Sequence, residues 1–341
     1  MMIVRLLPRI ALLAAGGMLL ASPISANDSE AEISMGGITL TPSSDLRLVS
    51  EDLYLSADKV TVDYLFENPT DRAITTTIAF PMPSQPRGML DRVDYYETNE
   101  DWSGFGFATR VDGRPVRLLQ MDRAMIGDRD VTEQVIANGW SIYWTYTSDG
   151  NPFANVPDEQ LATALAEGMA VRDELFGEDM VPAWEGVTYF VREQTFAPHS
   201  KTRVNHEYAP MIGGGMGGDL YPASWESEFS NLPEYRERYC LDEHFLAGVR
   251  RRMTGPNGET DGMGYIIETW LGYVLSSGAN WNGPIERFRL VVDKGSPDNL
   301  VSFCMDGVKQ IGPTQFEVVK TDFEPTRDLD ILIAEFYPKT D

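Results

Sequence analysis

The sequence is poor in the residue types that most often carry catalysis, metal binding or nucleic-acid binding. It contains 2 cysteines and 3 histidines among 341 residues, and 28 lysines and arginines stand against 52 aspartates and glutamates. The net charge of −24 argues against a nucleic-acid partner, because phosphate binding requires a basic surface. It argues against anionic membrane surfaces for the same reason. We therefore expect a solvated acidic surface that keeps the protein soluble.

Long apolar runs are absent after the first residues, so no later stretch is expected to cross a bilayer, which takes roughly 20 apolar residues. At the N-terminus, Arg5 and Arg9 precede an apolar run at 10–20, and small residues lead to Ala26. This order is typical of a cleaved secretory signal peptide. We expect cleavage after Ala26 and a mature protein in the periplasm or secreted. An uncleaved membrane anchor is the alternative, but the apolar run is short for a span.

Cysteine is limited to Cys240 and Cys304. In an exported protein an even number of cysteines usually means a disulfide. A bond between these two would close a long loop and stabilise the fold by about 4 kcal/mol on the chain-entropy account. A redox-active or nucleophilic cysteine is the alternative, but no Cys-x-x-Cys pair supports it.

Recognisable catalytic and ligand-binding motifs are also missing. No Gly-x-Ser-x-Gly sequence marks a nucleophilic serine. The glycine-rich run at 213–218 lacks the lysine and Ser/Thr of a phosphate-binding P-loop, so we expect a flexible loop there. Asp128 and Asp130 lack the glycine and glutamate that complete an EF-hand. His206 alternates with apolar residues, which predicts a core histidine. The sequence therefore assigns no catalytic residue, metal ligand or cofactor.

Alternating apolar and polar residues are abundant, and this period of two is typical of half-buried strands. Residues 60–83 read as two such strands around the turn residues 68–71, which predicts a β-hairpin with one face on a core. Residues 187–196 and 201–210 repeat this pattern. Residues 46–55 suggest two short strands, and Asp112-Gly113 predicts a tight hairpin turn.

Helical spacing of apolar residues occurs in two places, near 157–176 and 233–252. The fold class that follows is mainly β, with antiparallel sandwich-like sheets and two helical insertions, the first of which could act as a lid. The predicted organisation is a signal peptide at 1–26, an N-terminal β domain at 27–148, a helical insertion at 149–186, and a C-terminal β region at 187–341 with its short helical segment near 233–252.

Aromatic residues are concentrated at two places in the first half of the chain. Trp102 stands beside a glycine-rich turn, and Trp140 and Trp144 lie in a stretch at 140–147 that we predict to be a strand. These tryptophans could form a surface that stacks on sugars or binds a partner. Burial between sheets is the simpler explanation for such rings.

Several passages of the chain are recognisable when they are taken together. They are Asn27-Asp28-Ser29, Glu51-Asp52-Leu53 with Leu55-Ser56, residues 60–83, Tyr239-Cys240, Ser277-Gly278-Ala279-Asn280-Trp281, residues 290–294 and Ser302-Phe303-Cys304. They resemble a family of exported bacterial proteins known only as a domain of unknown function, and the resemblance extends from Asn27 to about Ala334. It implies a location in the bacterial envelope or outside the cell, and it implies no reaction, cofactor or catalytic residue. Both cysteines lie in the resembling passages, which supports a paired structural role.

The functional expectation is an exported, soluble binding or adaptor protein without enzymatic activity, whose partner is a protein or glycan of the cell envelope. The alternative is an extracytoplasmic hydrolase that works through paired carboxylates. A cleft with two convergent acids, one with a raised pKa, would favour the hydrolase. A flat or grooved aromatic patch without such acids would favour the binding protein.

Overall fold

The computed structural model describes residues 29–34, 37–41, 45–82, 106–145, 150–172, 180–210, 212–216, 219–228, 230–254, 264–275 and 280–338. The predicted signal peptide at 1–26 and Trp102 lie outside these ranges. Within them the protein is mainly β, and its strands form antiparallel-rich sheets, which confirms the predicted fold class.

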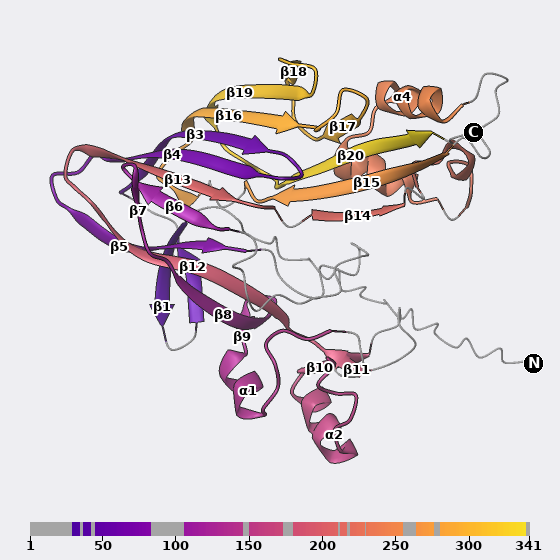
Figure 1. Cartoon of the computed structure of the whole chain (residues 1–341). Helices are drawn as coiled ribbons and strands as arrows, with labels where there is room; N and C mark the ends of the chain where they lie inside the picture. The colour runs from indigo at the N-terminus through magenta and orange to yellow at the C-terminus, as the bar shows by residue number, and fades with distance from the viewer. Residues whose placement is uncertain are drawn as a thin grey trace, which may run out of the picture.

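The largest sheet has eight strands and occupies the upper part of Figure 1. All its pairs are antiparallel except β16–β3, which is parallel. Its strands, in spatial order, are β18 (Lys309–Gln310), β19 (Gln315–Phe323), β16 (Ile285–Asp293), β3 (Arg47–Leu55), β4 (Val60–Asn68), β13 (Ser200–Tyr208), β6 (Ala108–Val111) and β7 (Arg114–Pro115).

Three further sheets complete the β structure. A six-stranded sheet contains β2 (Gly37–Thr41), β1 (Ser29–Ser34), β5 (Ile74–Pro81), β12 (Glu185–Phe196), β8 (Leu119–Ile126) and β9 (Arg129–Asp130). A four-stranded sheet contains β14 (Ile212–Met216), β15 (Gly264–Tyr273), β20 (Leu329–Pro338) and β17 (Leu300–Phe303). A short ribbon pairs β10 (Ala170–Arg172) with β11 (Met180–Pro182).

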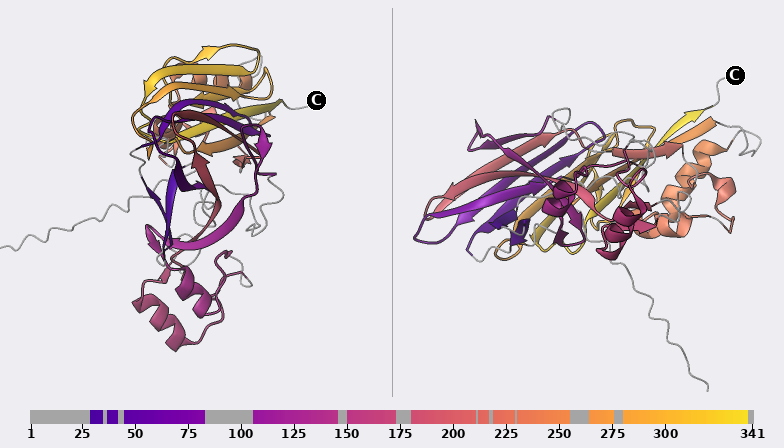
Figure 2. Two further views of the ribbon diagram at one scale, coloured as in Figure 1. Left: turned by 90° about the vertical axis from the view of Figure 1, so that its left-hand side faces the viewer. Right: turned by 90° about the horizontal axis from the view of Figure 1, so that it is seen from below.

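The helices are short and lie at the two extremes of the molecule (Figures 1 and 2). One pair sits below the six-stranded sheet, and the other packs on the four-stranded sheet. Their bounds are α1 (Thr132–Ala137), α2 (Asp158–Ala166), α3 (Leu232–Tyr239) and α4 (Glu243–Met253), with a 3₁₀ turn η3 at Pro222–Ser224. The predicted helix near 157–176 ends at Ala166, because Gly168 turns the chain with a φ of +69° into β10.

The main core lies where the three larger sheets face one another. In β4 every second residue is buried, which is the period of two that the sequence predicts. Phe66 on β4, Phe80 on β5 and Ile331 on β20 all belong to this one cluster, although they come from three different sheets. Strands from both predicted β segments alternate in the same sheets, since β4 lies beside β13 and β5 lies beside β12.

The predicted hairpin at 60–83 is wrong. β4 pairs with β3 and β13, whereas β5 pairs with β1 and β12, so the turn between them carries the chain from one sheet to another. The alternating pattern showed two half-buried strands but could not show which strands pair. The second alternating segment behaves in the same way, because β12 and β13 also belong to different sheets.

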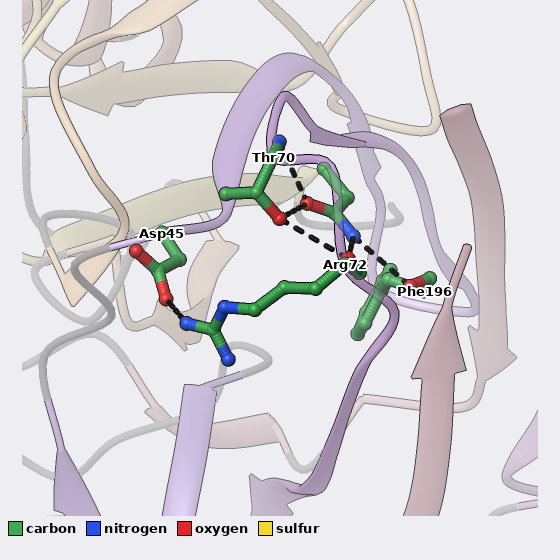
Figure 3. Close-up of polar contacts among 5 residues, drawn as sticks. Asp45, Thr70, Arg72 and Phe196 are labelled. Atoms are coloured by element: carbon green, nitrogen blue, oxygen red, sulfur yellow. Dashed lines mark hydrogen bonds and ion pairs between the residues drawn. The ribbon is translucent and has the colours of Figure 1, made fainter. Parts of the chain in front are cut away.

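These two sheet-to-sheet turns are hydrogen-bonded to each other (Figure 3). The side chain of Asn68 donates to the carbonyl of Phe196 at 3.0 Å and to the carbonyl of Arg72 at 2.8 Å. The backbone N–H of His199 donates to the carbonyl of Thr70 at 3.1 Å. Both turns that connect the eight-stranded to the six-stranded sheet are therefore bonded directly to each other.

Two other local predictions are corrected and one is confirmed. Residues 47–55 form the single strand β3, with a register shift between Leu48 and Ser50, instead of two short strands. Residues 140–145 form no strand, because their aromatic side chains pack beneath the helices and are not part of a ladder. The turn at Asp112-Gly113 joins β6 to β7 as predicted, with φ values of +48° and +77°.

Candidate functional site

The four-stranded sheet separates two clusters of buried side chains. On β15, Leu271 and Tyr273 face the main core, whereas Ile266 and Trp270 face a second cluster beneath α3 and α4. One face of the sheet is therefore covered by the main core and the other by the helices α3 and α4. Its edge strand β14 lies at its lower margin in Figure 1.

Strand β14 is formed by part of the glycine-rich run that we predicted to be a flexible loop, and that prediction is wrong. Its residues pair with β15, with Gly214 opposite Thr269 and Gly215 opposite Glu268. A Cβ atom on Gly214 would lie 2.4 Å from the carbonyl oxygen of Glu268, so the pairing requires glycine there. Three successive glycines hide the alternation of side chains from which a strand is normally predicted.

The outer edge of β14 has no partner among the described strands. In an antiparallel strand, alternate residues direct both their N–H and C=O groups to the same side. The outer groups of β14 therefore have no strand partner within the described ranges, and glycine offers no side chain that would shield them. Met216, the last residue of the strand, is 72% exposed.

The other outer strands are protected to different degrees. Outer strands β7, β9 and β18 have two residues each, which is too short to template a further strand. The other edge of the four-stranded sheet, β17, packs against α3 and α4. Strand β2 matches β14 in length, with five residues each. Strand β14 differs from all of these in its run of glycines.

Beside β14, a carboxyl group is buried under α3. Glu268 is 2% exposed, and its Oε2 accepts hydrogen bonds from the hydroxyl of Tyr235 at 2.9 Å and from the indole N–H of Trp270 at 3.0 Å. Burial raises the pKa of Glu268, and the two hydrogen bonds oppose that rise in pKa. The negative charge of Asp219 also raises this pKa.

A second buried polar group lies in the main core. The hydroxyl of Tyr273 donates to Oε1 of Glu51 at 3.3 Å and lies 3.0 Å from the hydroxyl of Tyr64. Burial raises the pKa of Tyr273 well above its ordinary value. His206 is fully buried and its Nδ1 lies 2.7 Å from the hydroxyl of Thr109, as expected for a core histidine.

The tryptophans considered for an aromatic surface lie in different surroundings. Trp144 is 1% exposed, and its indole N–H donates to the carbonyl of Trp184 at 2.9 Å. Trp140 is half-buried and stacks on Trp184 with ring centroids 5.6 Å apart. The structure therefore brings Trp140 and Trp144 into one packed cluster near α1 and α2 and places Trp144 inside it. Trp102 lies outside the described residues.

The two cysteines lie at disulfide distance, with their Sγ atoms 2.05 Å apart. Cys240 caps the C-terminal end of α3, and Cys304 directly follows β17. A bond between them attaches α3, and with it Tyr235, to the four-stranded sheet. Among the described residues, no group of three or more His, Cys, Asp or Glu residues could hold a metal ion. No described helix has the length and apolarity needed to span a membrane.

Fold and site together define a mainly β protein of antiparallel sheets with an open, glycine-rich strand edge. The chain belongs to the family described as a domain of unknown function, DUF4424, whose model matches residues 26–332. This confirms the resemblance given by the sequence passages. No curated protein matches the chain.

Several solved structures resemble the chain at low sequence identity. One is a protein of Legionella pneumophila provisionally described as nutrient binding, with 14% identity, a TM-score of 0.42, and coverage of 91% of this chain and 71% of that one. Another is an M1 zinc metallopeptidase of Deinococcus radiodurans, with 8% identity and a TM-score of 0.26. The match covers 86% of this chain but only 43% of the metallopeptidase. Likenesses this remote carry no argument about function.

Proposed function

We propose that the mature chain is an exported, non-enzymatic binding protein that takes an extended segment of a partner protein along the outer edge of β14. The observation that carries this proposal is the open edge with its three successive glycines. An extended peptide that adds a strand to such an edge gains main-chain hydrogen bonds, which are insensitive to its sequence.

The edge is held ready for an added strand. β14 is paired along its inner side with β15, which in turn pairs with β20 over ten residues. The helices and the second core cluster support the other side of this sheet. A strand that is already ordered does not lose conformational entropy on binding, so more of the interaction energy appears as affinity.

Export is the second part of the proposal. It is supported by the order of charged, apolar and small residues at 1–26 and by the disulfide distance between Cys240 and Cys304. Disulfides persist in oxidising compartments such as the periplasm. A protein partner is favoured over a glycan because Trp144 is buried in a packed cluster, whereas the outer edge of β14 pairs with none of the strands that the structure describes.

A carboxylate-dependent hydrolase is the second candidate, and one observation favours it. Glu268 has a raised pKa and lies near a second acid, Asp219. Its carboxyl group is covered by Tyr235 and is 2% exposed, so a substrate would reach it only if α3 moved. Replacing Glu268 with Gln would abolish such an activity and leave binding at the β14 edge intact.

Site-specific photo-crosslinking in the native envelope tests the proposed function. A crosslinking amino acid at position 216 replaces a side chain that is 72% exposed on the edge strand, and the matched control replaces Ile136, which is 60% exposed on α1. We expect one partner to be crosslinked from position 216 and not from position 136. An added copy of the protein without the crosslinker should compete for the partner and reduce crosslinking. The same copy with Met216→Lys should compete less well, because a charge on an edge strand discourages pairing. Equal crosslinking from both positions would contradict the proposal.

A further inference from the structure

We infer that the segment bound by β14 is basic, with Lys or Arg side chains beside the docked strand. This inference rests on the proposed function and names the chemistry of its ligand. It depends on the charges of the chain that follows the edge strand.

The chain that follows β14 is acidic over a long stretch. From Gly213 to Tyr235 the sequence contains no lysine or arginine. The four acids of this stretch make no ion pair among the described residues, and all but Asp219 are exposed. They are Asp219, Glu226, Glu228 and Glu234.

Hydrogen bonds connect distant parts of this stretch to Asp219. Asp219 follows Met216 closely, and its carboxylate accepts from the backbone N–H of Asn231 at 3.2 Å and from the Asn231 side chain at 3.3 Å. The carbonyl of Asp219 accepts from the indole N–H of Trp225 at 3.1 Å. These bonds tie Asp219 to Trp225, the neighbour of Glu226, and to Asn231, so the acidic stretch folds back on Asp219.

The basic groups near this stretch lie on α3 and α4. Arg236 donates to Glu243 at 2.7 Å, and Arg238 forms an ion pair with Asp330 at 3.3 Å. Arg250 lies over the ring of Trp225, 4.8 Å from its centroid, and Arg251 and Arg252 follow it in the last turn of α4. The stretch itself carries four carboxylates and no basic group, so the chain that leaves the edge strand is negatively charged.

The negative charge of this stretch favours one occupant of the edge over another. A second copy of the chain would bring the same acids and a net charge of −24 to the interface, and like charges placed side by side disfavour association. A basic segment would instead be attracted to the edge before it docks. Main-chain pairing contributes affinity for any extended peptide, and the charges beside it select basic peptides over others.

The test uses the mature oxidised protein and a displayed library of short random peptides. Selected peptides are synthesised, and hydrogen exchange measures protection of the backbone amides of residues 212–216 when each is bound. We expect the selected peptides to be enriched in Lys and Arg and to protect these amides. Replacing their basic residues with Glu should weaken binding up to about tenfold, since each exposed ion pair contributes modestly. Added salt should reduce the difference.

A pair of charge-matched variants locates the effect. Glu226→Gln with Glu228→Gln removes two exposed acids of the stretch that follows β14, whereas Glu133→Gln with Glu193→Gln removes two exposed acids on α1 and β12. The first variant should bind the basic peptides more weakly than the wild type, and the second should bind them as well as the wild type. Equal weakening by both would show that only the overall charge matters and would overturn the inference.

The remaining outcomes separate this inference from the proposed function. Peptides that protect residues 212–216 without any basic enrichment would overturn the inference and leave the proposed function standing. Selected peptides that leave these amides unprotected would overturn both. Concentration-dependent protection of the same amides in the protein alone would show that a second copy occupies the edge, and this too would overturn the inference.

Discussion

Glu268 shows how a single residue can link stability to pH in this protein. The carboxyl group lies between α3 and β15, accepts two hydrogen bonds on one oxygen, and is almost fully removed from water. Desolvation penalises its charged form, so its pKa lies above the ordinary value of 4.5. The unfolded chain therefore loses this proton at lower pH than the folded protein does.

The consequence is a loss of stability with rising pH at this residue. Below the unfolded pKa the carboxyl is neutral in both states, and its contribution is fully present. As the pH rises through the folded pKa, the folded state must either bury a charge or keep a proton that the unfolded chain has released. We expect Glu268→Gln to gain stability relative to the wild type between about pH 5 and about pH 8. Urea unfolding at the two pH values measures this gain.

Glu193→Gln is the matched control for this measurement, because Glu193 is exposed on β12. Its effect on the urea midpoint should be small and should not change with pH. If the Glu268→Gln midpoint ran parallel to that of the wild type across the range, ionisation of Glu268 would not be linked to folding.

Single residues also show which features of the structure could be predicted from the sequence and which could not. His206 was predicted as a core residue because it alternates with apolar neighbours, and the structure buries it. Glu268 was not identified, because acids are abundant in this chain and only the packing of Tyr235 and Trp270 around it makes it unusual. A buried acid has no sequence signature of its own.

At the scale of elements, strand β14 is the clearest departure from expectation. Its glycines predicted a loop, yet they form the strand that the proposed function depends on. Ile212 and Met216 lie on one side of the strand together with Gly214, so a period of two is present but is carried by only two side chains. Close approach of β15 explains the central glycine, because the Cβ of any other residue would meet the backbone.

Two neighbouring glycine substitutions test this explanation. A Cβ at Gly214 would lie 2.4 Å from the carbonyl oxygen of Glu268, whereas a Cβ at Gly215 would come no closer than 3.8 Å to the ring of Trp270. Gly214→Ala should therefore destabilise the protein by about 1–3 kcal/mol, as overpacking does. Gly215→Ala should change the free energy of unfolding by less than about 0.5 kcal/mol. Equal losses in chemical unfolding would show that the glycines are needed for some other reason.

At the scale of the whole molecule, the two hydrogen-bonded turns join the main sheets. β4 and β13 lie side by side in one sheet, β5 and β12 lie side by side in the other, and the turns between them meet at Asn68. Asn68 is fully buried and satisfies two carbonyls while it accepts from the backbone and hydroxyl of Thr70. Figure 3 shows this arrangement, with the ion pair of Arg72 and Asp45 beside it.

Removal of this side chain should affect the stability of both sheets. We expect Asn68→Ala to lower the free energy of unfolding by about 1–3 kcal/mol, because it removes the side-chain donor of the buried Phe196 carbonyl. Asn138→Ala provides the control, since the Asn138 side chain also donates to a carbonyl, at 2.9 Å, but is exposed at the end of α1. Thermal and urea unfolding measure both variants. A loss at Asn68 no larger than that at Asn138 would contradict a joining role.

The fold class, the buried faces of the strands and the two cysteines that could form a disulfide were predictable from the amino-acid sequence, because local periodicity and composition act within a few residues along the chain. The family was recognisable from the resemblance of several sequence passages. That β4 and β5 enter different sheets, that Trp144 is interior and that a glycine run forms an edge strand are properties of the folded chain alone. Strand pairing depends on contacts between segments far apart in sequence, such as β4 with β13, and the pattern of either segment alone does not contain them.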